Sequence, residues 1–307
     1  MNGLYDVHML TVNARSGLFR AFVLFIAILF LTLILSEPEW LNSIQIFRTP
    51  AASAKTKFEI RIQTVNDVPF VLATICGKPI WLCIDTGGEV SQLPDSFLSC
   101  LKVRSTGSIS NANGVRKSSL CIPVDIIIDG QEIKKFEATV VGSYTNANPG
   151  ANWYVDTPTL GLNALCQYRV VLDGHRGKLS LLDDDSPPSG ENWVAFEGFF
   201  GSLHQTVLAT SKSDGRQVRA FFDTGMDFSR TSKSILNEAD GTISILVGET
   251  CVVAKPRDIL DGKERVIEWE SKGSKKRVET DCALGWDVLK HYCIEISFKY
   301  RKLRVLP

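Results

Sequence analysis

The sequence lacks the patterns that mark several large classes of protein. Its 34 Lys and Arg residues are balanced by 34 Asp and Glu residues, so there is no excess positive charge for general nucleic-acid binding. None of the eight cysteines forms a C-x-x-C pair, and H-E-x-x-H is absent, which leaves no sequence sign of a metal or redox site. G-x-S-x-G, Walker and G-x-G-x-x-G motifs are absent too. We therefore expect no cofactor, no metal and no nucleic-acid partner.

Composition places the chain among folded globular proteins. Hydrophobic residues make up 44% and charged residues 22%, proportions that are typical of a folded chain and not of a disordered one. Glycine (23) and proline (12) occur at ordinary frequency, so no collagen-like or low-complexity segment is indicated. At 307 residues a single hydrophobic core approaches its size limit, and we expect two lobes.

One segment near the N-terminus is much more apolar than the rest. Residues 21–35 read AFVLFIAILFLTLIL without a charge; Arg15 and Arg20 precede them, and Glu37 and Glu39 follow. A membrane-spanning helix needs about 20 apolar residues, whereas the apolar part of a signal peptide has about 7–15. The run lies on the border between these cases, and no good cleavage site follows it directly. Basic residues before the run and acidic residues after it predict that the rest of the chain crosses the membrane.

These features divide the first part of the chain into three segments. We expect a cytoplasmic N-terminus at 1–17, an uncleaved transmembrane anchor at 18–36 and a tether at 37–57 with little periodicity. A cleaved signal peptide and a buried helix are open alternatives for 18–36. The anchor and the signal peptide agree on location. Either one places the folded part on the non-cytoplasmic side, periplasmic or extracellular, attached to the membrane or secreted after cleavage.

The chain beyond the tether contains two similar halves. Val-Leu-Ala-Thr occurs at 71–74 and again at 207–210, and an Asp-Thr-Gly triplet follows each copy. The neighbouring residues also match, as WLCIDTGGEVS against RAFFDTGMDFS and as LGLNAL against LGWDVL. Several matches in the same order indicate a duplication. We expect one lobe at 58–183, a linker at 184–193 and a second lobe at 194–307.

Both halves have the patterns of β structure. A short apolar run precedes each triplet, and alternating segments around Asp129-Gly130 predict a hairpin. The segments 168–182 and 292–306 are further hairpin candidates. Two short helical stretches follow the Leu-Gly pairs, at 162–166 and 286–290. The expected fold class is all-β, with two similar lobes and an N-terminal membrane helix.

The chemistry of the chain centres on the triplets Asp85-Thr86-Gly87 and Asp223-Thr224-Gly225. An Asp that follows an apolar strand is displayed where the strand leaves the core, and the Gly permits a sharp turn with close backbone approach. If the lobes pack about a two-fold axis, Asp85 and Asp223 come face to face. Two carboxylates in contact share one proton, a behaviour known from aspartic proteases. The pair can hold a water molecule, with one carboxylate as base toward the water and the other as acid toward a carbonyl oxygen.

With these motifs the chain resembles a retropepsin-like aspartic protease in tandem, a single-chain, two-lobed relative of the pepsin clan. The resemblance consists of an apolar strand, an Asp-Thr-Gly triplet and a later Leu-Gly element in each half, and it covers everything beyond the tether. It implies two retropepsin-like β-barrel lobes with pseudo-two-fold symmetry and a catalytic dyad of Asp85 and Asp223. It also implies that the Thr and Gly residues of both triplets support the dyad, each Thr through a bond to the opposite lobe.

The resemblance further implies a hairpin flap that closes over the substrate. In the first lobe the segment 105–117 has the expected place and glycine content; the flap candidates are Ser105, Gly107, Asn113 and Gly114. In the second lobe 240–249 is a poorer match. The chain departs from the family after each triplet, where Gly88 and Met226 replace the usual Ser, Thr or Ala. Without a hydroxyl group to bond the ionised carboxylate, the acid limb of activity is expected at higher pH than in relatives that have one.

The predicted function is therefore hydrolysis of peptide bonds by an aspartic endopeptidase held on the membrane. The alternative is a non-catalytic peptide-binding module on the same bilobal fold, holding extended chains in the cleft between the lobes. Intact Asp and Thr residues in both triplets favour the enzyme, because a binding module needs neither pair. The duplication supplies both carboxylates in one chain, so we expect a monomer to suffice for activity on a polypeptide substrate.

Overall fold

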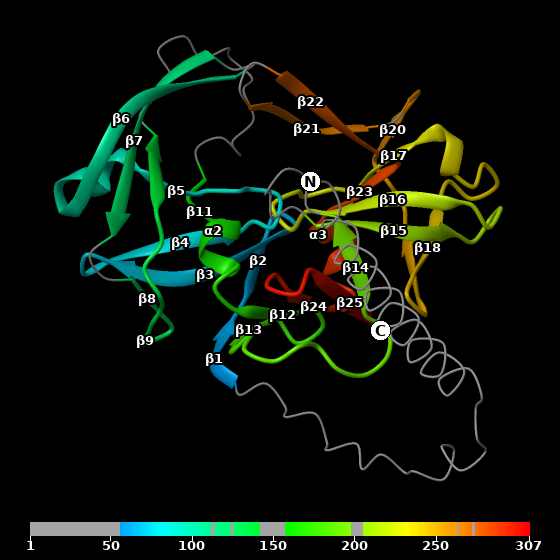
Figure 1. Cartoon of the computed structure of the whole chain (residues 1–307), viewed down its shortest axis with the longest axis horizontal. Helices are drawn as coiled ribbons and strands as arrows, with labels where there is room; N and C mark the ends of the chain where they lie inside the picture. Colours follow the sequence, from blue (N-terminus) through cyan, green and yellow to red (C-terminus); the bar gives the residue numbers. More distant parts are fainter. Residues whose placement is uncertain are drawn as a thin grey trace, which may run out of the picture. The chain divides into compact units, whose positions relative to one another are not determined.

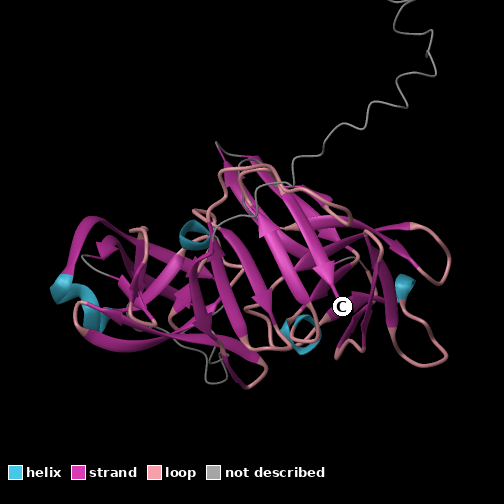
Figure 2. Ribbon diagram, turned by 90° about the horizontal axis from the view of Figure 1, so that it is seen from below, coloured by secondary structure: helices cyan, strands magenta, loops and turns pink. Residues whose placement is uncertain are grey.

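The computed structural model describes residues 56–111, 114–123, 126–141, 157–197, 205–262, 264–271 and 274–307. Strands predominate in this part of the chain and helices are short (Figure 1, Figure 2), which confirms the expected β class. The segment Ser53–Pro307 forms one compact unit. The expected cytoplasmic N-terminus, anchor and nearly all of the tether lie outside the described residues. Among the residues that are described, no helix has the length and apolar character needed to cross a bilayer.

The N-terminal half begins two residues before the expected start at Phe58. Its strands are β1 (Thr56–Arg61), β2 (Gln63–Val65), β3 (Val68–Ile75), β4 (Lys78–Ile84), β5 (Ser91–Pro94), β6 (Leu101–Asn111), β7 (Gly114–Pro123), β8 (Ile126–Ile128), β9 (Gln131–Glu132), β10 (Ala138–Val141), β11 (Thr159–Leu160), β12 (Arg169–Asp173) and β13 (Lys178–Leu182). Its helical elements are the 3-10 helix η2 (Asp95–Cys100) and the single turn α2 (Leu162–Leu165).

The C-terminal half is also built from strands with two short helical elements. Its strands are β14 (Val194–Glu197), β15 (Thr206–Ser211), β16 (Gln217–Phe222), β17 (Arg230–Ser232), β18 (Ile243–Val247), β19 (Thr250–Ala254), β20 (Asp258–Leu260), β21 (Glu264–Ser271), β22 (Ser274–Thr280), β23 (Cys282–Leu284), β24 (Cys293–Ser297) and β25 (Lys302–Leu306). Its helical elements are η4 (Lys233–Ile235) and α3 (Trp286–Leu289).

Several hairpins turn through two residues that both have positive φ, the geometry that joins tightly twisted antiparallel strands. Asp129-Gly130 joins β8 to β9 with φ of 50° and 75°, as the sequence predicted. Asn66-Asp67 joins β2 to β3, and Cys76-Gly77 joins β3 to β4, with φ between 50° and 73°. The hairpins expected at 168–182 and 292–306 are confirmed as β12–β13 and β24–β25.

One sheet contains strands from both halves. The first six strands of this sheet have the order β1-β13-β12-β24-β25-β14, and β12 pairs antiparallel with β24 where the halves meet. Val170 lies opposite Ile296 and Leu172 opposite Ile294, and all four side chains are buried. Burying a side chain of this size stabilises a fold by about 1.5–3 kcal/mol. The junction is therefore a continuous apolar core and not a flexible connection between separate domains.

Each half repeats one arrangement around its triplet. β4 ends directly before Asp85 and pairs in parallel with β11, which pairs antiparallel with β5. β16 ends directly before Asp223 and pairs in parallel with β23, which pairs antiparallel with β17. The single helical turn α2 follows β11, and α3 follows β23 in the same way. The two helices expected after the Leu-Gly pairs are therefore confirmed. Asp85 and Asp223 therefore follow strands that have equivalent neighbouring strands in the two halves.

The halves differ in their long hairpins. β6 and β7 form a hairpin between β5 and β8, and the segment 105–117 lies on it. β18 pairs with β15 as β8 pairs with β3, so the hairpin that contains 240–249 matches β8–β9, and the weaker flap match in the second half was wrong. The C-terminal half has its long hairpin elsewhere, as β21–β22 between β20 and β23. Figure 1 shows β6–β7 and β21–β22 along the same edge of the fold.

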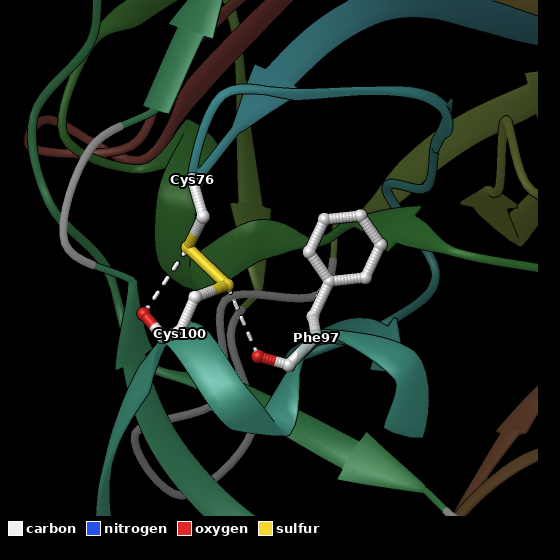
Figure 3. The surroundings of a disulfide bond; sticks show 3 residues. All are labelled: Cys76, Phe97 and Cys100. Carbon is white, nitrogen blue, oxygen red and sulfur yellow. Dashed lines mark hydrogen bonds between the residues drawn. A yellow bond between two sulfur atoms is a disulfide. The ribbon is translucent and has the colours of Figure 1, made fainter.

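One disulfide bond joins Cys76 in the β3–β4 turn to Cys100 at the end of η2 (Figure 3). β6 begins at the next residue, so the bond ties the base of the β6–β7 hairpin to β3 and β4, the strands that precede Asp85. The other six cysteines are not disulfide-bonded, three of them buried and three partly buried: Cys83, Cys121, Cys282, Cys166, Cys251 and Cys293.

The β2–β3 turn provides a polar contact between the halves. Asp67 accepts hydrogen bonds from Lys290 Nζ at 2.7 Å and from Arg257 Nη2 at 3.0 Å. Trp286 Nε1 donates to Thr64 Oγ1 at 3.1 Å beside this ion cluster. The bond from Lys290, followed by the bond and charge of Arg257, lowers the pKa of Asp67 from its ordinary value of 3.8 although partial burial opposes the shift.

Candidate active site

The two triplets begin directly after the last residues of β4 and β16. The Asp85 N–H donates to the Leu160 carbonyl at 3.1 Å, and the Asp223 N–H donates to the Leu284 carbonyl at 3.0 Å. Each acceptor is the last residue of the parallel strand beside it, β11 or β23. The Leu-Gly element of each half therefore positions the backbone of the Asp in the same half.

Two threonine hydroxyl groups join the triplets to each other. Thr86 Oγ1 donates to the Phe222 carbonyl at 3.0 Å and accepts the Thr224 N–H at 3.0 Å. In the reverse direction Thr224 Oγ1 donates to the Ile84 carbonyl at 2.7 Å and accepts the Thr86 N–H at 3.1 Å. Both threonines are 1% exposed, so these bonds are shielded from water. Every donor has its counterpart in the other half, which places the two triplets in register.

Backbone amides hold the two carboxylates. Asp85 Oδ1 accepts the N–H groups of Gly87 at 2.9 Å and of Gly88 at 2.8 Å. Asp223 Oδ1 accepts the Gly225 N–H at 2.9 Å. Gly88, which replaces the usual Ser, Thr or Ala, thus contacts the Asp85 carboxylate through its backbone amide. Whether the missing hydroxyl group shifts the acid limb of activity to higher pH stays a prediction.

Each carboxylate lies over the glycine of the opposite triplet. A Cβ atom placed on Gly225 would lie 2.5 Å from Asp85 Oδ1 and 3.2 Å from Asp223 Oδ1, and one on Gly87 would overlap the Asp223 carboxyl group. The two Oδ1 atoms are therefore no farther apart than the sum of these two distances. Only glycine leaves room for this approach, because real Cβ contacts below 3.0 Å essentially never occur. The structure thus brings all six predicted triplet residues together.

A serine behind each triplet completes the support. Ser91 Oγ donates to Asn163 Oδ1 at 2.8 Å and accepts the Gly161 N–H at 2.9 Å. In the C-terminal half Ser229 Oγ donates to Asp287 Oδ1 at 2.8 Å and accepts the Gly285 N–H at 2.9 Å. These bonds tie the loop after each Asp to its helical turn. Sequence reasoning did not single out these residues, although they align in the repeated segments.

Cys83 lies on β4 two residues before Asp85 and is only 3% exposed. Burial raises the pKa of its thiol well above the ordinary value of 9.0, and the negative charges of Asp85 and Asp223 raise it further. The thiol is therefore neutral near pH 7, which suits a small buried apolar residue and not a nucleophile.

Three of the four flap candidates, Ser105, Gly107 and Gly114, lie on the strands of the β6–β7 hairpin. Ser105 is opposite Leu120, Gly107 is opposite Ser118, and Gly114 pairs with Asn111 next to the tip. Asn113 lies outside the described residues. Their role over the carboxylates stays a prediction.

Among the described residues, no group of three His, Cys, Asp or Glu side chains is arranged to hold a metal ion. Comparison of the chain with protein-family models and with curated proteins found no match. The arrangement of the two triplets therefore has to be interpreted from its own geometry.

Proposed function

We propose that the chain is an aspartic endopeptidase that hydrolyses peptide bonds with a water molecule activated by Asp85 and Asp223. The observation that carries the proposal is the reciprocal pair of threonine bonds, which seats each carboxylate over the glycine of the opposite triplet. If each Asp-Thr-Gly turn served folding alone, it would not need to bond to the equivalent triplet of the other half. The architecture we infer is that of two retropepsin-like lobes, related by pseudo-two-fold symmetry, in one chain.

The proposed reaction uses one proton shared by the pair. The ionised carboxylate takes a proton from the bound water, whose oxygen attacks the carbonyl carbon of the substrate, and the protonated carboxyl group gives its proton to the carbonyl oxygen. Collapse of the tetrahedral intermediate breaks the C–N bond: the carboxyl group that took the water proton gives it to the leaving amine nitrogen, and the other carboxylate takes a proton back from a hydroxyl group of the intermediate. Both protonation states must coexist, so activity should be bell-shaped in pH.

The domain plan we infer follows the duplication, with lobes at 58–183 and 194–307 joined by 184–193. Because both carboxylates come from one chain, a monomer should be sufficient. The β6–β7 hairpin is the proposed flap over the substrate, since β7 pairs with β10 and β10 pairs with β5, the strand that follows the first triplet.

The proposed location is the non-cytoplasmic side of a membrane, with residues 18–36 as anchor. The Cys76–Cys100 disulfide supports this location, because such bonds persist in oxidising compartments. Secretion after cleavage of a signal peptide is the alternative.

A peptide-library digest at several pH values, with and without a statine-containing inhibitor, tests the proposal. We expect cleavage that is strongest in acid and blocked by the inhibitor. Asp214→Asn is the control for replacement of Asp223, because Asp214 caps the exposed β15–β16 turn at the opposite end of β16 from Asp223. Binding of peptides without cleavage at any pH would instead identify the non-catalytic peptide-binding module.

A further inference from the structure

An exposed apolar face surrounds Trp81 on the N-terminal half. Val65, Leu72 and Trp81 are 42%, 46% and 45% exposed although each is a large apolar side chain. Two adjoining hollows, of about 360 Å³ and 270 Å³, flank Trp81 and share Gln63. Apolar patches of this kind mark sites of interaction with another molecule or a membrane.

The hollows open at a gap beside β3. β2 pairs with β3 as far as Phe70, opposite Gln63, and β8 pairs with β3 from Ala73, opposite Ile128. Leu72 lies between these two partners and is opposite Trp81 on β4. The sheet therefore leaves the Leu72–Trp81 pair uncovered at this point.

The C-terminal half has a charged pair at the equivalent place. Leu208, which corresponds to Leu72 in the repeated Val-Leu-Ala-Thr segment, is opposite Arg219 and not a tryptophan. Arg219 Nη2 lies 3.7 Å from Glu197 Oε2, and Glu197 pairs with β15 as Gln63 pairs with β3. The same fold thus carries an ordinary solvated ion pair in one half and an apolar face in the other. Folding alone does not require Trp81 to be exposed.

The entry point of the chain indicates what covers this face. Ile60 and Arg61 of β1 line the larger hollow, and the chain reaches β1 from the apolar run at 21–35 through the tether. In Figure 1, β1, β8 and β9 lie toward the edge of the fold opposite β21 and β22. The lining has one positive side chain, Arg61, and one negative one, Asp129, so its recognition chemistry is apolar and not that of a charged headgroup.

We propose that the Val65–Leu72–Trp81 face lies in the interfacial layer of the membrane to which the chain is tethered. Tryptophan favours this layer because its ring is apolar and its N–H can bond to headgroups or water. The edge with the β6–β7 and β21–β22 hairpins then faces away from the bilayer, where a polypeptide could approach. This inference rests on the proposed membrane tether and not on the proposed peptidase activity.

Photo-crosslinking of the full chain in phosphatidylcholine liposomes tests the proposal. A benzoylphenylalanine side chain is introduced at Trp81 in one sample and at Arg219 in the matched control, and lipid adducts are counted by mass spectrometry. We expect several-fold more lipid adducts from position 81 than from position 219, with no increase when anionic lipid is added. Equal lipid labelling at the two positions would overturn the proposal. So would crosslinks from position 81 to a second chain, to a polypeptide or to residues 37–55.

Flotation of the same liposomes separates failure of the face from failure of the tether. A chain that does not float with the liposomes overturns both, whereas one that floats without lipid adducts at position 81 overturns only the face. Quenching by brominated lipid gives a second measurement that does not depend on the introduced group. Trp81→Phe should remove a larger part of the quenchable fluorescence than Trp193→Phe, whose ring packs against Arg304 at 4.8 Å. Equal losses from the two variants would contradict membrane contact at Trp81.

Discussion

Thr86 and Thr224 each use one hydroxyl group for two bonds to the opposite half, and this determines what their replacement should do. The hydroxyl donates to a carbonyl and accepts an amide, and all partners are in the buried centre of the molecule. Removing it leaves two backbone groups without these bonds, at a cost of the order of 1–3 kcal/mol for each buried unsatisfied group.

We therefore expect Thr86→Ala to lower the free energy of unfolding by about 2 kcal/mol or more. Thr86→Ser keeps the hydroxyl group and should lose much less. Urea unfolding at pH 7 measures both, and Thr224→Ala with Thr224→Ser repeats the comparison in the other half. If the Ala and Ser variants unfold at the same urea concentration, the hydroxyl bonds do not join the halves as described.

Among individual residues, the sequence predicted the candidate catalytic triplets but not the serines that hold the loops after them in place. The Asp, Thr and Gly of each triplet were identifiable because the duplication repeats them after the same apolar strand. Ser91 and Ser229 were not, since an isolated serine does not indicate that it will bond to residues 72 and 58 positions away. Only the folded sheet brings these partners together.

Among the secondary-structure elements, the hairpins with characteristic local sequence patterns were predictable. The Asp129-Gly130 turn predicted β8–β9, and alternating apolar and polar residues predicted β12–β13 and β24–β25. Parallel pairing of β4 with β11 and of β16 with β23 was not predictable, because those strands are distant in sequence and their register is decided by packing. The same limit explains why 240–249 was matched to the wrong hairpin: its own sequence does not show that it pairs with β15.

The Cys76–Cys100 bond gives a prediction for the elements it joins. It spans 24 residues and fixes η2, at the base of the β6–β7 hairpin, to the β3–β4 turn. Closing a loop of this length stabilises a fold by about 3 kcal/mol by restricting the unfolded chain. The double variant Cys76→Ser with Cys100→Ser should therefore unfold at clearly lower urea concentration. Cys166→Ser is a control, since Cys166 is free. Equal unfolding of the double variant and wild type would show that the bond does not form.

In the whole molecule, the cluster around Asp67 links the halves in a way that depends on pH. Since Lys290 and Arg257 lower its pKa in the folded protein, the stabilisation is complete above its ordinary value of 3.8 and declines as pH falls through the folded value. The groups are partly exposed, so we expect Asp67→Asn to cost only about 0.5–1 kcal/mol at pH 7.

Urea unfolding of wild type and Asp67→Asn across pH measures this link. The difference between them should be constant from pH 7 to about 5 and shrink toward zero in strong acid. Asp129→Asn provides the control, because Asp129 also lies with positive φ in a two-residue hairpin turn, between β8 and β9. A difference that persists unchanged below pH 2 would contradict an ionic link.

In the proposed enzyme, Asp85 and Asp223 of one chain form one catalytic pair. Hydrolysis of a susceptible peptide by Asp85→Asn, by Asp223→Asn and by an equimolar mixture of the two variants measures whether both carboxylates must come from the same chain. We expect no turnover from either variant, because each destroys the shared-proton pair, and none from the mixture, because no chain then contains both carboxylates. Near-wild-type turnover by either single variant would show that the two carboxylates are not a catalytic pair, and recovery of activity on mixing would show that the pair is assembled between chains.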